Sequence, residues 1–529
     1  MTSEKKTTPK KSERGAYFVA AGILFSRISG LIRMRALAHF LGSSDAGDAF
    51  YAAIKIPNFP QNLLGEGVLS ASFIPVYANL IARGNKEEAT RVAGIILSLL
   101  SLAVSIIVTL GILTTPYFID LIAPGFTGEK RLLTITLVRI IFPGTGLLVI
   151  SAWCLGILNS HHKFFLSYIA PVVSNLSVVF VLFFFRHEPA QSRLAFYAAC
   201  GLLLGSSLQL LVQLPTVLKL VPHLRLSLTT RLHSVREIIR NFVPVVISRG
   251  VVQLSAYIDS ILASFLPSGA VAALGYAQSI YMLPISLFGM SISAAELPTM
   301  SQAYGTENFK DILKRRIDSA FRKIAFFVVP SVVGFLTLGD VIAGVLFQTG
   351  QFNQETSYYV WRVLGGAAVG LLASTLGRLY SSAFYSLRDT RTPLKFSIVR
   401  VILTTVLGYT IGLRAPEWFH IDTSWGTAGL TASAGLAGWV EFLLLRSRIN
   451  HQIGQTGIPL SLLFKLWFSA LMGSALGFTL KIYIPTTHHP FLKGVLILTL
   501  YSLTYFSLTA LFKIEESRLF LKRILSRLR

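Results

Sequence analysis

The sequence predicts an all-α polytopic membrane protein with about 14 transmembrane helices. Three observations lead to this fold class. The 529-residue chain is 53% hydrophobic and only 14% charged, whereas soluble chains carry roughly 25% charged residues. Apolar segments of about 20 residues or more recur along the whole chain. Lys and Arg gather in alternate connections between these segments, which is typical of proteins inserted with their basic loops on one side of a membrane.

Each expected span is an apolar run that ends at charged residues, Pro or Gly. The second expected span contains IPNFPQNLLGEG, with two prolines and two glycines, which predicts a structural break at Pro57, Asn58 and Pro60. A broken helix is tolerated in a membrane only inside protein or along a cavity, so the break indicates a water-filled interior. The fourteen expected spans are 17–41, 49–79, 89–113, 132–158, 164–186, 194–218, 239–265, 271–303, 321–346, 358–387, 394–413, 425–446, 463–484 and 492–512.

The basic residues predict the orientation of the chain. The formal net charge is +24, and most of it lies in loops on one side, namely 81–92, 219–240, 309–323, 387–395 and 446–452. By the positive-inside rule this side faces the cytosol, and an even number of spans places both termini there. Nucleic-acid binding is excluded, because it would need a basic soluble face and no soluble segment here is long enough to form one.

A weak internal repeat predicts two pseudo-symmetric six-helix lobes. The pattern that begins at Ser26-Arg27 returns at Ser248-Arg249, and Phe-Leu, Tyr, Pro and Gly follow in the same order. Transporters built from repeats usually bind substrate at the interface between them. The expected domains are a cytosolic basic tail (1–16), an N-lobe (17–218), a cytosolic basic linker (219–238), a C-lobe (239–446), two further spans (463–512) and a C-terminal tail (513–529).

The C-terminal tail contains IEESRLFLKRILSRLR, which alternates apolar and basic residues at helical spacing. This pattern predicts an amphipathic helix on the inner leaflet. A frayed basic tail is the alternative interpretation.

The first span carries three arginines, Arg27, Arg33 and Arg35, in an otherwise apolar helix. At the centre of a bilayer an Arg costs on the order of 2.5–3.5 kcal/mol. Arg27 lies about 15 Å into the span at 1.5 Å per residue, near the midplane. Arg33 and Arg35 are nearer the outer end and can partly reach an interface.

Two further cations are expected at membrane depth, Lys55 in the second span and Arg249 in the seventh. The nearby acids, Asp48 and Glu66, are too few to neutralise all five cations. We therefore expect a hydrated cationic cavity for an anionic ligand, since Arg favours bidentate recognition of phosphate. A structural network of salt bridges is the alternative.

Other charges within the expected spans have simpler explanations. The candidates are Arg139, Arg362, Arg378, Arg400 and Glu441, and several of them lie close to helix ends. Arg139 and Arg378 are interpreted as buried structural pairs or interfacial groups. Ser-His-Asp spacing, metal-ligand clusters and a P-loop are missing from the sequence. We therefore expect a transporter without a catalytic site, a metal or a cofactor, which draws on an ion gradient, the membrane potential or the substrate gradient.

Several motifs together resemble the bacterial lipid II flippase family (MviN/MurJ) of the MATE-like MOP exporter superfamily. The resemblance runs from about residue 16 to 450 and continues more loosely through the last two spans. The motifs that carry it are SRISGLIR, DAFYAAIKIPN, GEGVLSASFIPVYA, LIAPGF, SFLPSGAVAALGYAQ, LPISLFG and FYSLRDTRTP.

The resemblance implies a flippase that moves undecaprenyl-diphosphate-linked peptidoglycan precursor across the bacterial cytoplasmic membrane through a central cavity that opens alternately to each side. It implies that residues 463–512 form a groove for the polyprenyl tail, and that partners include the cell-wall synthesis machinery. The substrate-binding residues that carry over are Arg27, Arg33, Lys55 and Asp48. Asp259 corresponds to an acidic position that some members use for a coupling cation.

The sequence also departs from the family pattern. Members often have arginines where this chain has Gln61, Asn62 and Ser279, and it offers Arg35 and Arg249 instead. We interpret this as relocation of cavity charge to different helices. Three other readings stay open: an exporter of another polyprenyl-linked glycan, a cation or drug antiporter, whose cavity should be acidic, and a non-transporting scaffold for wall-synthesis partners.

Overall fold

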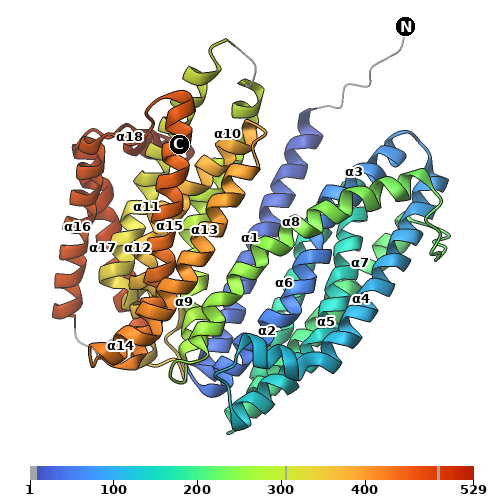
Figure 1. Ribbon diagram of the computed structural model, residues 1–529, viewed down its shortest axis with the longest axis horizontal. Helices are drawn as coiled ribbons and strands as arrows, with labels where there is room; N and C mark the ends of the chain where they lie inside the picture. The colour runs from blue at the N-terminus through green and yellow to red at the C-terminus, as the bar shows by residue number, and fades with distance from the viewer. Residues whose placement is uncertain (1–8, 304–306, 485–488, 529) are drawn as a thin grey trace. The chain divides into compact units, whose positions relative to one another are not determined.

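The computed structural model describes residues 9–303, 307–484 and 489–528, and these form helices joined by short connections (Figure 1). Within them, the side chains of 9–21, 244–245, 247–256, 521 and 523–528 are outside the description. Beyond the helices, the described residues contain one isolated β-bridge, Thr349 to Phe352. The all-α fold class is thereby confirmed.

Contacts divide the chain into two compact units, Met1–Ile261 and Leu262–Arg529. The boundary falls near the end of the seventh expected span, 239–265, whereas the sequence assigned that whole span to the second lobe. The helices up to this boundary are α1 (Pro9–Leu41), α2 (Asp45–Leu64), α3 (Glu66–Ala82), α4 (Lys86–Ile122), α5 (Gly128–Ser160), α6 (Phe164–Phe184), α7 (Gln191–Leu220) and α8 (His233–Ala263).

Unit 2 is also helical, and two of its helices contain π-helical turns. Its elements are α9 (Ala270–Pro284), η1 (Ile285–Met290), α10 (Ser291–Ala303), α11 (Phe309–Phe347), α12 (Gln354–Ser386), α13 (Arg391–Leu407), η2 (Gly408–Arg414), α14 (Ala415–Trp418), η3 (Thr423–Trp425), α15 (Gly426–Ile453), α16 (Leu460–Tyr483), α17 (Pro490–Leu511) and α18 (Glu515–Leu528).

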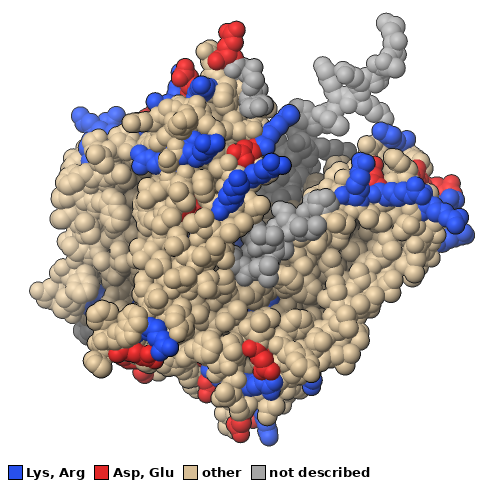
Figure 2. All heavy atoms as spheres, viewed as in Figure 1, with Lys and Arg blue, Asp and Glu red and all other residues tan. Residues whose placement is uncertain are grey.

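Twelve segments of the described chain are long and apolar enough to cross a membrane. α1 and α8 are further helices of 33 and 31 residues, above the roughly 20 residues that a span requires. The expected count of fourteen stays a prediction for these two helices. In each unit, the Lys and Arg side chains visible in Figure 2 gather toward the helix ends, and a broad uncharged band covers the middle.

The most buried spans are α5 in unit 1 and α11 and α12 in unit 2. α5 packs against α2, α4 and α7, while α1 packs mainly against α6. Ser44 caps the start of α2, because its hydroxyl accepts a hydrogen bond from the Gly47 N–H at 3.2 Å, which satisfies one of the free donors of the first turn. These contacts fix the helices that carry the predicted site.

The helix break predicted at Pro57, Asn58 and Pro60 lies instead at Gly65. α2 continues through both prolines, which are buried, and ends at Leu64. Each proline removes only one backbone hydrogen bond, and packing within the protein compensates for that loss. At Gly65 the backbone turns to φ −85° and ψ −155°, and α3 starts at the next residue.

Gly65→Ala is expected to lower the stability of the protein by about 1–3 kcal/mol, the usual cost of overpacking. A Cβ at this position would meet the carbonyl oxygen of Gln61. That oxygen also accepts the Gly65 N–H at 2.8 Å, so it cannot move away freely. Thermal unfolding in detergent measures the effect. Gly377→Ala is the control, because a Cβ there meets nothing within 4 Å, and equal melting temperatures for the two variants would contradict the argument.

Two tyrosines of α17 hold this helix against α11 at a proline. Pro330 lacks an N–H, so the Phe326 carbonyl four residues earlier loses its usual partner within α11. The Tyr505 hydroxyl donates to that carbonyl at 2.6 Å. The Tyr501 hydroxyl donates to the Pro330 carbonyl, also at 2.6 Å. Figure 1 shows α17 beside α16, and both helices pack on α11.

The C-terminal tail forms α18, which packs back onto the bundle. The Phe520 ring lies 5.7 Å from that of Phe327 on α11 and 5.2 Å from that of Phe506 on α17, measured between centroids. Its location on the inner leaflet stays a prediction.

Candidate functional site

α1, the helix that carries the arginines, is anchored to α6 by a short polar network. The Asn175 amide donates to the Ser29 hydroxyl at 2.9 Å, and that hydroxyl donates to the Ser26 carbonyl at 2.9 Å. Ser29 and Asn175 are both buried. Hydrogen bonds between buried polar groups fix a helix in one rotational setting, since breaking them leaves unsatisfied donors. The network therefore sets the direction in which the α1 arginines point.

Arg27 and Arg33 have no carboxylate partner among the described residues. Arg27 is exposed, and so are Ile28 and Leu31 beside it. Arg33 is half-buried, and its Nε is buried without a hydrogen-bond acceptor in the described chain. The Tyr51 hydroxyl on α2 interacts with Arg33 electrostatically. Two guanidinium groups on one helix thus keep donors that a ligand could satisfy.

Arg35 differs from these two residues, because it has interactions of its own within the protein. It is half-buried on the last part of α1. Its expected contribution to ligand binding stays a prediction.

Lys55 and Asp259 were expected to have separate roles, and the structure brings them together. The Lys55 ammonium interacts electrostatically with Asp259 and donates a hydrogen bond to Ser260 on α8. The Tyr257 hydroxyl donates to the Lys55 carbonyl at 2.9 Å, and its ring lies 5.9 Å from that of Phe59. The carboxylate expected to bind a coupling cation therefore already has an internal ammonium beside it, and both assigned roles stay predictions.

Asp48 lies in a buried ion pair that sequence reasoning missed. Its carboxylate is 2.6 Å from the Lys130 ammonium on α5, and its side chain is 1% exposed. Lys130 also pairs with Asp45 at 2.8 Å and lies 4.4 Å above the Phe126 ring. The geometry favours a structural role for Asp48, joining α2 to α5. One feature of the sequence could have indicated this ion pair. Two acids stand in the first turn of α2, where they would attract a cation from a neighbouring loop.

The other positions singled out in the sequence lie on α8, α2 and α9. Arg249 lies on α8, and its side chain is outside the described residues. Asn58 is exposed and Gln61 half-buried on α2. The Ser279 hydroxyl in unit 2 donates to the Tyr276 carbonyl of its own helix at 2.6 Å. The relocation of cavity charge to Arg249 therefore stays a prediction.

Some charged groups in the spans of unit 2 are paired, whereas Arg362 and Arg378 have no ion-pair partner among the described residues. The guanidinium of Arg400 lies 3.1 Å from the Glu441 carboxylate, which also accepts from Ser397 at 2.7 Å. Lys481 on α16 lies 2.6 Å from Asp340 on α11. These pairs connect neighbouring helices and offer little surplus charge.

Arg27 and Arg33 on α1 offer guanidinium groups that no carboxylate of the described chain neutralises. Guanidinium and ammonium groups bind phosphate strongly at membrane depth, because water competes weakly there. Within the described ranges, no group of three His, Cys, Asp or Glu side chains could hold a metal ion.

Comparison with known proteins gives a consistent answer. A family model described as lipid II flippase MurJ matches residues 37–502. The chain is 30% identical over 442 residues to a probable lipid II flippase MurJ of Rickettsia prowazekii, covering 83% of this chain and 84% of that protein. It is 28% identical over 438 residues to lipid II flippase MurJ of Burkholderia cenocepacia, covering 82% of each. The family match begins after Arg27, Arg33 and Arg35, so it carries no information on these three residues.

Solved structures share the fold. The chain resembles a lipid II flippase MurJ in an inward closed conformation with a TM-score of 0.75 at 23% identity, covering 93% of this chain and 98% of that one. It also resembles an inward-facing multidrug resistance MATE family transporter of the MOP superfamily, with a TM-score of 0.65 at 20% identity over 80% and 95% of the two chains. Because the family model and the relatives cover most of its length, the chain belongs to the lipid II flippase MurJ family.

Proposed function

We propose that this protein is a flippase that moves lipid II, the undecaprenyl-diphosphate-linked peptidoglycan precursor, from the inner to the outer leaflet by alternating access. The family membership supports this function. The observation that carries the site is the pair of α1 arginines without carboxylate partners, Arg27 and Arg33. Their guanidinium groups offer forked N–H donors that match the oxygens of a diphosphate.

Binding and release follow from charge. The diphosphate occupies donors that the protein leaves free on Arg33, and it competes with Asp259 for the Lys55 ammonium. Arg35 and Arg249 assist as further cations. In this scheme the substrate is bound and released unchanged, so the protein needs no catalytic residue.

The membrane potential provides a driving force for this cycle. Moving one elementary charge through the potential is worth about 2.3 kcal/mol per 100 mV. An empty cationic site is drawn toward the negative cytosolic side, while a bound diphosphate cancels that positive charge and lets the site return outward. A coupling cation at Asp259 is the alternative source of energy.

The protein would work in the bacterial cytoplasmic membrane with both termini in the cytosol. The basic loops support this orientation, since Lys and Arg are retained on the cytosolic side. Delivery of the precursor to the outer leaflet would place the protein next to the cell-wall synthesis machinery.

The test is to deplete the native flippase of a model bacterium, express this chain, and measure labelled lipid II in the outer leaflet. The wild-type chain should restore its appearance, and Arg27→Ala should reduce it at least tenfold at equal membrane abundance. Arg91→Ala is the matched control, because Arg91 is an exposed residue paired with Glu87 at 2.6 Å, and it should retain activity. An inserted wild-type chain that moves no lipid II would refute the function. Full activity of Arg27→Ala would refute only the site.

A second candidate is an exporter of a different polyprenyl-linked glycan. It is favoured by Gln61 and Ser279, which stand where members of the family often have arginines. Proteoliposomes loaded with lipid II or with another undecaprenyl-diphosphate glycan distinguish the two. Comparable transport of lipid II by Arg249→Ala and by the wild-type chain would also argue against relocation of the missing charges to that position.

A further inference from the structure

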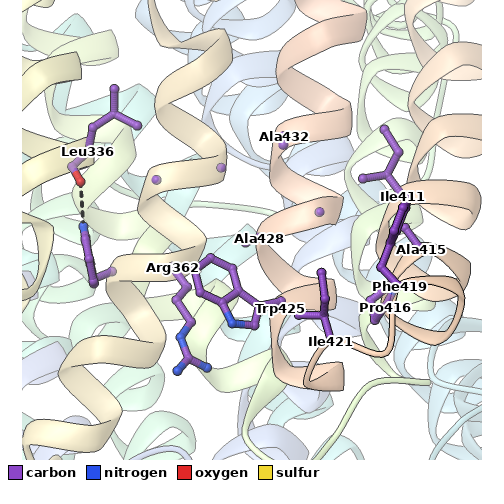
Figure 3. A pocket seen from close by; sticks show the side chains of 14 residues that line it. Leu336, Arg362, Ile411, Ala415, Pro416, Phe419, Ile421, Trp425, Ala428 and Ala432 are labelled. Atoms are coloured by element: carbon purple, nitrogen blue, oxygen red, sulfur yellow. Dashed lines mark hydrogen bonds between the residues drawn. The ribbon is translucent and has the colours of Figure 1, made fainter.

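A pocket of about 460 Å³ lies wholly within unit 2, between α11, α12, α15 and the segment from η2 to η3 (Figure 3). Ligand pockets in proteins measure about 300–1,000 Å³. Its walls are almost entirely apolar. The lining residues are Leu336, Trp361, Arg362, Gly365, Gly366, Ile411, Ala415, Pro416, Phe419, Ile421, Trp425, Ala428, Gly429 and Ala432.

Arg362 is the one charged residue of the lining. It is half-buried, and its guanidinium carbon lies 5.0 Å from the centre of the Trp425 ring. One guanidinium nitrogen donates to the Ser424 hydroxyl at 2.6 Å. In Figure 3 the guanidinium points away from Leu336 and lies beside the Trp425 ring. Its other N–H groups have no hydrogen-bond acceptor in the described part of the chain.

The carboxylate of Asp422 does not neutralise Arg362 by direct contact. Asp422 is exposed and interacts with Arg362 electrostatically, but it lies beyond ion-pair distance, and its carboxylate accepts the Ser424 N–H at 2.9 Å. Arg362 therefore has an apolar cavity on one side and free donors at its mouth.

Exposed aromatic side chains place this mouth at the depth of lipid headgroups. Trp418 is 65% exposed, Phe419 71% and Trp425 46%. Trp is enriched where membrane helices cross the interface, because its ring is apolar and its N–H is polar. Arg362 lies nine residues after the N-cap Asn353, about 14 Å along α12, within reach of a headgroup phosphate by snorkelling.

We propose that this pocket binds one acyl chain of an anionic bilayer phospholipid, whose phosphate pairs with Arg362. The single cation selects a lipid of net negative charge, because the ammonium of a zwitterionic headgroup would compete for the same phosphate. The apolar walls take up the hydrocarbon chain. This site lies in unit 2 and is distinct from the arginines of α1 that bind the flipped substrate.

Gly365 gives a way to close the pocket without disturbing the backbone. It lines the pocket, and a Cβ added there meets nothing within 4 Å. Gly365→Leu therefore fills the cavity with a side chain. Gly377 is the matched control, since it lies on the same helix, is equally open and is not part of the lining of this pocket.

Native mass spectrometry of the full chain in detergent tests the proposal, with equal amounts of phosphatidylglycerol and phosphatidylcholine added. The wild type and Gly377→Leu should retain phosphatidylglycerol preferentially. Arg362→Gln should lose at least fivefold of that preference, and Gly365→Leu should lose the retained lipid, with melting temperatures of the lipid-free proteins close to that of the wild type.

Three results would overturn it. They are an unchanged preference in Arg362→Gln, unchanged retention in Gly365→Leu, and displacement of phosphatidylglycerol by undecaprenyl phosphate at equal concentration, which would make the occupant a polyprenyl lipid. None of these results bears on lipid II translocation, so the proposal fails or stands independently of the proposed function.

Discussion

Arg33→Met is expected to stabilise the folded protein and at the same time to weaken lipid II translocation strongly. The Nε of Arg33 is buried without an acceptor in the described chain, and an unsatisfied buried donor costs about 1–3 kcal/mol, more when the group is charged. Methionine keeps most of the length and removes that cost. Loss of a charged hydrogen bond to the diphosphate, about 1.5–3 kcal/mol, should weaken transport roughly ten- to a hundredfold.

Opposite changes in stability and activity are the signature of a binding residue. The melting temperature in detergent and the outer-leaflet lipid II signal should be measured on the same preparations. Arg33→Lys should recover part of the activity, since it restores a positive charge but not the planar fork of donors. A variant Arg33→Met that melts earlier than the wild type would show instead that Arg33 is a structural residue.

Asp48→Ala is expected to destabilise the protein by about 3 kcal/mol, the lower end of the range for breaking a buried ion pair. The carboxylate of Asp48 is almost fully buried and lies 2.6 Å from Lys130. Removing it leaves the Lys130 ammonium, 16% exposed, with the more exposed Asp45 as its remaining ion-pair partner in the described chain. That remaining pair explains why the loss should not be larger. Thermal unfolding in detergent gives the measurement.

The double variant Asp48→Ala/Lys130→Met separates structure from substrate binding. It removes both charges, so it should regain most of the lost stability. If Asp48 is structural, the double variant should also translocate lipid II at close to the wild-type rate. A stable but inactive double variant would return Asp48 to the substrate site.

The sequence predicts the helical fold well because its signal is local. Long apolar runs ended by charges define spans without reference to any partner. Arg27 and Arg33 are also visible locally, since a cation in an apolar run has a high cost wherever it points. The sequence could not show that Arg33 lacks an acceptor, because that depends on how α1 packs on α6 and approaches Tyr51.

The sequence could not predict which residues pair when they lie far apart in the chain. Lys130 follows Asp48 by 82 positions and lies at the start of α5, where it reads as an ordinary loop residue. Lys55 and Asp259 are each recognisable, yet nothing in their neighbourhoods indicates that they meet. The pocket beside Arg362 arises only where several helices of unit 2 pack together.

The break in the second span illustrates a different limit. Prolines predict helix ends because they remove a backbone donor, but α2 tolerates Pro57 and Pro60 inside a packed protein. Gly65 marks the actual break, where no side chain can fit beside the Gln61 carbonyl. Intrinsic helix propensity predicts that the prolines break the helix, but the packing of the folded protein places the break at the glycine.

Pro330 has a consequence for the order in which this protein is made. α11 enters the membrane long before α17 is synthesised, and until then the Phe326 carbonyl lacks the Tyr505 hydroxyl that it accepts in the finished fold. An unsatisfied carbonyl in hydrocarbon costs several kcal/mol. We therefore expect the nascent chain to keep α11 near water, lipid headgroups or the insertion machinery until its last helices arrive. If synthesis stops before residue 490, α11 keeps an unsatisfied carbonyl, and we expect the membrane proteases that remove misfolded proteins to recognise it.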